Sequence, residues 1–113
     1  MDRSTTSELD GAALQEHRLE AGGLHLQYYT AGREGPPVVL LHGGGVDSAL
    51  LSWRPLIPVL ARSHRVYAPN WPGYGESRPV IRPYTVEALV PVLDRLMDAW
   101  GVERASLVGI SMG

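Results

Sequence analysis

The apolar run Val38–Leu41 constrains the fold more than any other feature of the sequence. It follows two prolines, ends in glycines and shows no alternation of polar and apolar side chains. A strand with one face in water alternates, whereas an unbroken apolar run of this length is typical of a strand buried on both faces. The sequence therefore predicts a central strand of a sheet that is covered on both sides.

The segments around this strand read alternately as strands and helices, after an opening hairpin whose two strands are joined by Ala21-Gly22-Gly23. Such alternation indicates βαβ crossovers and a doubly wound, mostly parallel sheet of the α/β class. The expected elements are strands at 17–20 and 24–29, the central strand, a helix at about 54–62, a strand at 64–70, a helix at 85–100 and a buried strand at 105–110.

Prolines and caps set the expected ends of the two helices. Pro55 and Pro58 restrict where the first helix can begin. The second has Thr85 as a candidate N-cap and Gly101 where a C-terminal glycine is favoured, and Pro91 should kink it or move its start.

We expect one domain or part of one. Residues 1–15 are polar and aperiodic, so they are predicted to be a loose N-terminal leader, and order should begin at about residue 16 and continue to residue 113.

Composition excludes several classes of function. A formal charge of −2 and a pI near 6.0 offer no basic surface for nucleic acid or anionic lipid. The chain has no cysteine, so a nucleophile must be an oxygen, and no segment is apolar enough to span a membrane or act as a signal peptide. We expect a cytoplasmic protein with a small-molecule substrate and neither a nucleic acid nor a membrane as partner; the oligomeric state is left open.

The end of the chain, Gly109-Ile110-Ser111-Met112-Gly113, fits the pattern G-x-S-x-G after a predicted strand. Where a strand turns abruptly into a helix, the serine is held in strained backbone geometry, and its neighbours two residues away must lack side chains. The alternative is an ordinary turn of small residues.

A second glycine motif, His42-Gly43-Gly44-Gly45, follows the central strand directly. Backbone N–H groups in such a loop can bind the oxyanion that develops when a serine attacks an acyl carbonyl, and losing one donor costs about 3 kcal/mol of transition-state stabilisation. An ordinary glycine turn and a phosphate cradle are the alternatives, although a phosphate loop ending in G-K-[ST] is excluded because the chain has no lysine.

Three motifs in this order, "VVLLHGGGVDS", "RVYAPNWPGYGES" and "ASLVGISMG", resemble the N-terminal half of an α/β-hydrolase of the serine type. The resemblance implies that Ser111 is the nucleophile and that Gly44 and Met112 supply the oxyanion-hole N–H groups, with Gly43 or Gly45 as alternatives to Gly44.

The remaining motif residues are implied to be structural. His42 would hold the glycine loop and would not be the catalytic base, and Gly43, Gly45, Gly109 and Gly113 would support the two turns. Asn70 stands where the family's D-x-P-G-x-G-x-S loop usually has aspartate, which puts the hydrogen bonding of that loop in doubt.

A serine at this turn implies acyl transfer, whereas an aspartate would suit haloalkane or epoxide opening. The motifs are similar to those of meta-cleavage product hydrolases, carboxylesterases, lactonases and perhydrolases, which need no cofactor and no metal.

In this fold the catalytic acid and histidine follow the serine in chain order, so neither is expected here. His17, His25 and His64 are interpreted as structural.

We therefore expect the chain to be a fragment that ends at the nucleophile turn and is inactive alone. One alternative is a non-catalytic binding module of α/β-hydrolase origin that uses the open edge of the sheet. Another is complementation, in which a separate chain supplies the acid and the histidine.

Overall fold

The computed structural model describes residues 2–9 and 12–113, with side chains from Leu14 onward. Within these residues, strands β1 to β6 form a single sheet in the order β1-β2-β3-β5-β4-β6. Neighbours are antiparallel from β1 to β5, and the pairs β5-β4 and β4-β6 are parallel. The elements are β1 (Asp2–Leu9), β2 (Ala12–Ala21), β3 (Leu24–Ala31), β4 (Pro37–Leu41), α1 (Ala49–Trp53), α2 (Ile57–Leu60), β5 (Arg65–Pro69), α3 (Val86–Trp100) and β6 (Ser106–Gly109).

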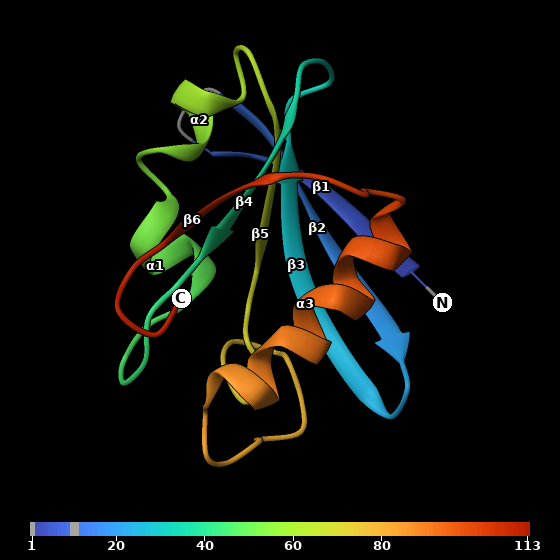
Figure 1. Ribbon diagram of the computed structural model, residues 1–113. Helices are drawn as coiled ribbons and strands as arrows, with labels where there is room; N and C mark the ends of the chain where they lie inside the picture. Colours follow the sequence, from blue (N-terminus) through green and yellow to red (C-terminus); the bar gives the residue numbers. More distant parts are fainter. Residues whose placement is uncertain (1, 10–11) are drawn as a thin grey trace.

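Helices cover both faces of the sheet, with α1 and α2 on one side and α3 on the other (Figure 1). The side chains of β4 alternate between these two layers. Val38 and Leu40 belong to the core cluster that includes α1 and α2, whereas Val39 and Leu41 pack with residues of α3. All four are buried, which confirms the prediction of a central strand enclosed on both faces.

The predicted hairpin is confirmed. Strands β2 and β3 pair antiparallel up to Ala21↔Leu24, and Gly22 and Gly23 form the connection with φ of +55° and +81°. Both angles lie in the left-handed region that a tight hairpin turn requires and that glycine adopts without steric cost.

The structure differs from the expected loose leader. Residues 2–9 form β1, which pairs with β2 from Asp2↔Leu19 to Leu9↔Ala12, while residues 1, 10 and 11 lie outside the described residues. A polar sequence does not exclude an edge strand, because backbone groups make the ladder hydrogen bonds and threonine favours extended structure.

The first predicted helix is also different. Instead of one helix at about 54–62, the structure has α1 before the prolines and the short α2 after Pro55. The Ser48 side chain caps α1 by accepting a hydrogen bond from the Leu51 N–H at 3.1 Å. This serine begins a helix earlier than the apolar spacing alone indicates, and Pro55 interrupts it because proline has no N–H to donate.

The second helix agrees with its caps. Thr85 accepts a hydrogen bond from the Ala88 N–H at 3.2 Å, and Gly101 ends the helix with φ of +69°. Pro91 lies inside α3 without moving its start.

Strand β6 forms where it was expected but is exposed along its length. Leu107 in β6 and Ile110 just after it retain 53% and 50% of their surface, because β6 is an edge strand and no described element covers its outer side. The prediction of a buried strand is therefore wrong for this chain. In the described part of the chain, no helix combines the length and apolar character needed to cross a membrane.

Candidate active site

Ser111 lies in a tight turn immediately after β6. The Gly113 N–H closes the turn by donating to the Ile110 carbonyl oxygen at 2.9 Å, and the Ile110 N–H donates to the Leu41 carbonyl oxygen at 3.2 Å. Among the described residues, Ser111 alone has a positive φ without being glycine, at +56°. Non-glycine residues held in this region store about 1–3 kcal/mol of strain, which the surrounding structure must stabilise.

Close backbone contacts explain the glycines on either side of Ser111. A Cβ atom on Gly109 would lie 2.3 Å from the carbonyl carbon of Gly113, and one on Gly113 would lie 2.2 Å from the carbonyl oxygen of Leu41. Both contacts are with backbone atoms, so no side-chain movement relieves them. This is the crowding that the G-x-S-x-G pattern predicts.

The glycine loop after β4 lies against this turn, because β4 and β6 are parallel neighbours that end at the same edge of the sheet. A Cβ atom on Gly43 would be 3.2 Å from the Ser111 Cβ, and one on Gly44 would be 3.5 Å from the Met112 sulfur. The fold therefore brings together two motifs that are far apart in the sequence.

The N–H groups of this loop differ in their availability. The Gly43 N–H donates to the Asp47 carboxylate, with 2.7 Å between the nitrogen and Oδ2. No acceptor within the described part of the chain meets the N–H groups of Gly44, Gly45 or Met112. Of the three glycines considered for the oxyanion hole, Gly43 is thus already engaged.

His42 is fully buried and has two fixed partners. Its Nε2 accepts a hydrogen bond from the Trp71 N–H at 3.0 Å, so the ring proton resides on Nδ1, which donates to the Gly43 carbonyl oxygen at 2.7 Å. Burial lowers the pKa of His42, although the Gly43 carbonyl and the Asp47 carboxylate oppose that shift. A neutral imidazole with both nitrogens occupied holds the loop and has no free nitrogen to act as a base.

Asp47 connects the glycine loop to α1. In addition to the Gly43 N–H, its carboxylate accepts from the Ser48 N–H at 2.8 Å and from the Ser52 hydroxyl at 2.7 and 2.8 Å. Burial by itself would raise the pKa of Asp47, but the hydrogen bonds from Ser52, Ser48 and Gly43 outweigh it and lower the pKa overall.

Both polar atoms of the Asn70 side chain have a hydrogen-bond partner where aspartate is usual. Its amide oxygen accepts from the Ala49 N–H at 2.7 Å, and its amide nitrogen donates to Gln27 Oε1 at 2.8 Å. Gln27 Oε1 also accepts from the Glu76 N–H at 2.8 Å, and the Gln27 amide nitrogen contacts the Glu16 carboxylate. Asparagine is therefore accommodated at this position, because the buried Gln27 presents its oxygen to the Asn70 amide nitrogen.

No histidine or carboxylate in the described residues hydrogen-bonds the Ser111 hydroxyl. His17 donates to or accepts from the Thr30 hydroxyl at 2.7 Å, His25 lies 3.9 Å from the Glu20 carboxylate, and His64 pairs with the Ser63 hydroxyl. All three are engaged elsewhere on the molecule. Within the same residues, no group of three His, Cys, Asp or Glu side chains is arranged to hold a metal ion.

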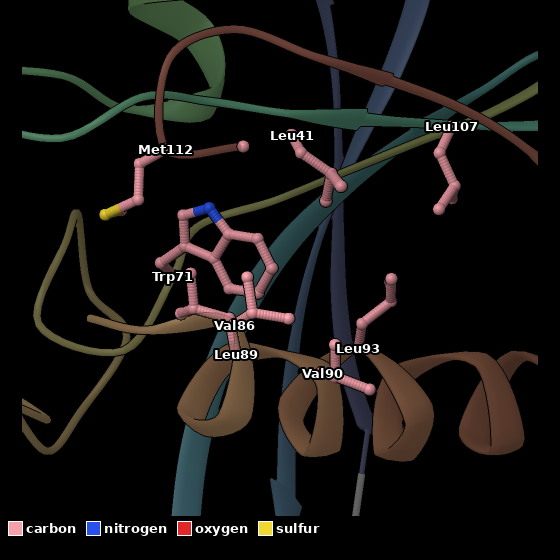
Figure 2. Close-up of a pocket in the computed structure, with 9 residues that line it drawn as sticks. Leu41, Trp71, Val86, Leu89, Val90, Leu93, Leu107 and Met112 are labelled. Atoms are coloured by element: carbon pink, nitrogen blue, oxygen red, sulfur yellow. The ribbon is translucent and has the colours of Figure 1, made fainter. Parts of the chain in front are cut away.

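An apolar pocket of about 190 Å³ lies between α3 and the C-terminal part of the chain, and Figure 2 shows the side chains that line it. Ser111 does not line it, so the pocket lies beside the Ser111 turn and not at the Ser111 hydroxyl. Its lining residues are Leu41, Trp71, Val86, Leu89, Val90, Leu93, Leu107, Met112 and Gly113.

Comparison with known proteins identifies the family. The model of the α/β hydrolase fold matches residues 36–113, which is more than half of the chain. The chain belongs to the α/β hydrolase fold family, as the three motifs and the sheet order lead one to expect.

Similar proteins include two kinds of hydrolase. A 2-hydroxy-6-oxo-6-(2'-aminophenyl)hexa-2,4-dienoic acid hydrolase of Metapseudomonas resinovorans is 37% identical over 109 residues, covering 95% of this chain and 37% of that protein. Epoxide hydrolase A of Mycobacterium tuberculosis is 41% identical over 101 residues, covering 87% of this chain and 31% of that protein.

Among solved structures, the 2-hydroxy-6-oxo-6-phenylhexa-2,4-dienoate hydrolase of Rhodococcus sp. strain RHA1 has a TM-score of 0.78 and 37% identity, covering 90% of this chain and 39% of that one. The chain thus spans less than two-fifths of the length of each of these relatives.

Sequence reasoning missed two polar residues that organise the site. The motif resemblance gives Asp47 no role, although the Asp-Ser pair before an apolar run is a helix-start signal that indicates its place at the start of α1. Gln27 occupies a polar position of an alternating strand, which predicts exposure, and nothing in the sequence indicates that a distant loop buries it.

Proposed function

We propose that this chain is the N-terminal part of a serine hydrolase in which Ser111 attacks an acyl carbonyl carbon. The observation that carries the proposal is the strained φ of +56° at Ser111, which presents the residue at a turn crowded by two glycines. The N–H groups of Gly44 and of the neighbouring Met112, which have no acceptor among the described residues, support an oxyanion hole beside the serine.

In the proposed reaction the Ser111 oxygen forms a bond to the carbonyl carbon, and its proton passes to a histidine base. The bond to the leaving group then breaks as the leaving group takes that proton, and water hydrolyses the acyl-enzyme by the same steps. The resemblance implies that the histidine and its acid partner follow the serine in the chain. Because no described histidine reaches Ser111, the 113-residue chain is expected to be inactive by itself.

For the substrate we propose an acyl compound, either an ester or a 2-hydroxy-6-oxo-dienoic acid of the kind named for the similar hydrolases. The similarity to epoxide hydrolase A brings epoxides into consideration as well. A serine favours the acyl reaction, since epoxide opening through an alkyl-enzyme ester uses a carboxylate nucleophile.

The test is turnover by the complete reading frame that contains this chain, with and without Ser111→Ala. We expect hydrolysis of p-nitrophenyl esters or of a 2-hydroxy-6-oxo-dienoate, no opening of styrene oxide, and a fall in kcat of about 10⁴-fold or more in the variant. Ester hydrolysis that survives Ser111→Ala would exclude this serine as the nucleophile.

A second candidate is a binding module that pairs through β6, and it is favoured by the exposed edge carrying Leu107 and Ile110. An uncovered apolar edge strand is a ready template for another chain. If this candidate is right, the 113-residue chain is a soluble monomer that unfolds cooperatively when expressed alone; aggregation on expression would argue against it.

A further inference from the structure

Two side chains hold the glycine loop at Gly43: His42, as the motif resemblance implies, and Asp47, to which the resemblance gives no role. His42 Nδ1 donates to the Gly43 carbonyl oxygen, while the Asp47 carboxylate accepts from the Gly43 N–H. Both peptide groups that flank the Gly43 Cα are therefore fixed by side chains, one by a donor and one by an acceptor.

Fixing these two peptides determines where the next donor points. The Gly43 carbonyl and the Gly44 N–H belong to one planar, trans peptide unit, so they point in opposite directions. With the carbonyl turned toward His42, the Gly44 N–H is directed away from that ring, and Gly44 lies beside Met112. The orientation holds only while the preceding peptide is also prevented from rotating, and glycine has the freedom to rotate unless something holds it.

We propose that Asp47 is a positioning residue for this reaction: its carboxylate anchors the Gly43 N–H to α1 and thereby aims the Gly44 N–H at the oxyanion formed on attack by Ser111. The inference rests on the proposed function of Ser111 and deepens it. The anchor is firm because two serines donate to the same carboxylate: Ser48, the N-cap of α1, through its N–H, and Ser52, within α1, through its hydroxyl.

A carboxylate is required at this position, and its neutral isostere does not replace it. Both Asp47 oxygens act as acceptors: Oδ2 from the Gly43 N–H and the Ser52 hydroxyl, Oδ1 from the Ser48 N–H and the same hydroxyl. An asparagine has a single acceptor oxygen, so its NH₂ group would face either the Gly43 N–H or the Ser48 N–H. Asp47→Asn therefore loosens one end of the anchor while keeping the shape of the side chain.

The charge of Asp47 makes the test sharper. A negative group near the developing oxyanion opposes it electrostatically, so removing the charge alone would accelerate the reaction. Loss of the anchor would slow it. The proposal predicts that the positional effect is the larger one.

The experiment uses the complete protein with the variants Asp47→Asn and Ser52→Ala, and with Asp94→Asn, on the exposed side of α3, as the matched control. For each we would measure kcat and KM on p-nitrophenyl acetate and the Ki of a trifluoromethyl ketone, which binds as an oxyanion adduct. Asp47→Asn should lower kcat/KM by about 30- to 100-fold, which is less than the effect of losing a whole oxyanion donor. The affinity for the inhibitor should fall by the same factor, and KM should change by less than about threefold. Ser52→Ala should lower kcat/KM and the affinity for the inhibitor by about 3- to 10-fold each. The control Asp94→Asn should match the wild type in both measurements.

A purely structural role would lower the unfolding midpoint without this parallel loss of kcat and inhibitor affinity. Unchanged or higher kcat in folded Asp47→Asn would overturn the inference. Should that variant not fold, Ser52→Ala decides, and wild-type kinetics there would overturn it equally. If instead Ser111→Ala stays active, the proposed function itself fails, whereas an inactive Ser111→Ala beside a fully active Asp47→Asn refutes this inference alone.

Discussion

At the scale of single residues, Ser111 adopts a backbone conformation that glycine enters freely and serine does not. The spacing of Gly109 and Gly113 around it predicts that strain from the sequence, because each glycine removes a side chain that would strike the backbone. The part played by Asp47 could not be predicted in the same way. Its four contacts depend on how the loop curls back onto α1, which no local pattern encodes.

Gly109→Ala should destabilise the protein by about 1–3 kcal/mol, because the added Cβ meets the Gly113 backbone and no flexible side chain can move aside. The measurement is the urea midpoint of the complete protein. Gly44→Ala is the control: its Cβ would make only ordinary contacts, so its stability should stay within about 0.5 kcal/mol of the wild type. Equal stability of the two variants would show that the turn is not crowded.

His42 should make stability depend on pH. Its pKa is lowered in the folded protein, chiefly by burial, so between that value and about 6.5 the unfolded chain binds more protons. The contribution is fully present above pH 6.5 and is lost as the pH falls below it. His42→Leu should cost about 1–3 kcal/mol at pH 8, because the buried Trp71 N–H loses its acceptor, and should give a flatter profile between pH 7 and 5. Parallel profiles for the two proteins would contradict this account.

At the scale of elements, apolar runs and helix-capping residues in the sequence predict most of the strands and helices. The unbroken apolar run predicts β4, and Thr85 with Gly101 predicts both ends of α3. The separation of α1 from α2 could not be predicted from the spacing of apolar residues. The Ser48 cap and the two prolines, Pro55 and Pro58, determine where these helices begin and end. The polar link from β3 to the loop after β5 was also unpredicted, since it joins Gln27 to Asn70 over 43 positions of the sequence.

Gln27 and Asn70 should be energetically coupled. Removing either leaves the polar atoms of the other buried without their partner, so the second substitution adds little. A double-mutant cycle with Gln27→Ala and Asn70→Ala, followed by urea unfolding, should give a coupling of about 0.5–3 kcal/mol. Asn70→Ala combined with Asp94→Ala serves as the distant control and should be additive. Additivity in the first pair would mean that the link contributes nothing.

At the scale of the whole molecule, both faces of the sheet are covered but its β6 edge is open, and the apolar pocket of Figure 2 adjoins that edge. The sequence predicts a strand there from its apolar composition, and exposure follows from what surrounds the strand, which composition does not specify. An exposed edge of this kind is the feature that the fragment and the binding-module proposals explain differently.

Leu107→Lys distinguishes these proposals. In the 113-residue chain the side chain is 53% exposed, so the substitution should change stability by no more than about 0.5 kcal/mol and should reduce aggregation. In the complete reading frame, where we propose that β6 is covered, the same change should cost about 3 kcal/mol or more through burial of a charge. Equal, small effects in both contexts would indicate that the edge stays open.

The central claim is tested most directly by covalent labelling of the complete protein with a fluorophosphonate, followed by mass spectrometry of its peptides. The account predicts one phosphonyl adduct, located on Ser111 and lost together with hydrolytic activity in Ser111→Ala. An adduct on another residue, or full turnover by a protein that the reagent has not modified at Ser111, would contradict it.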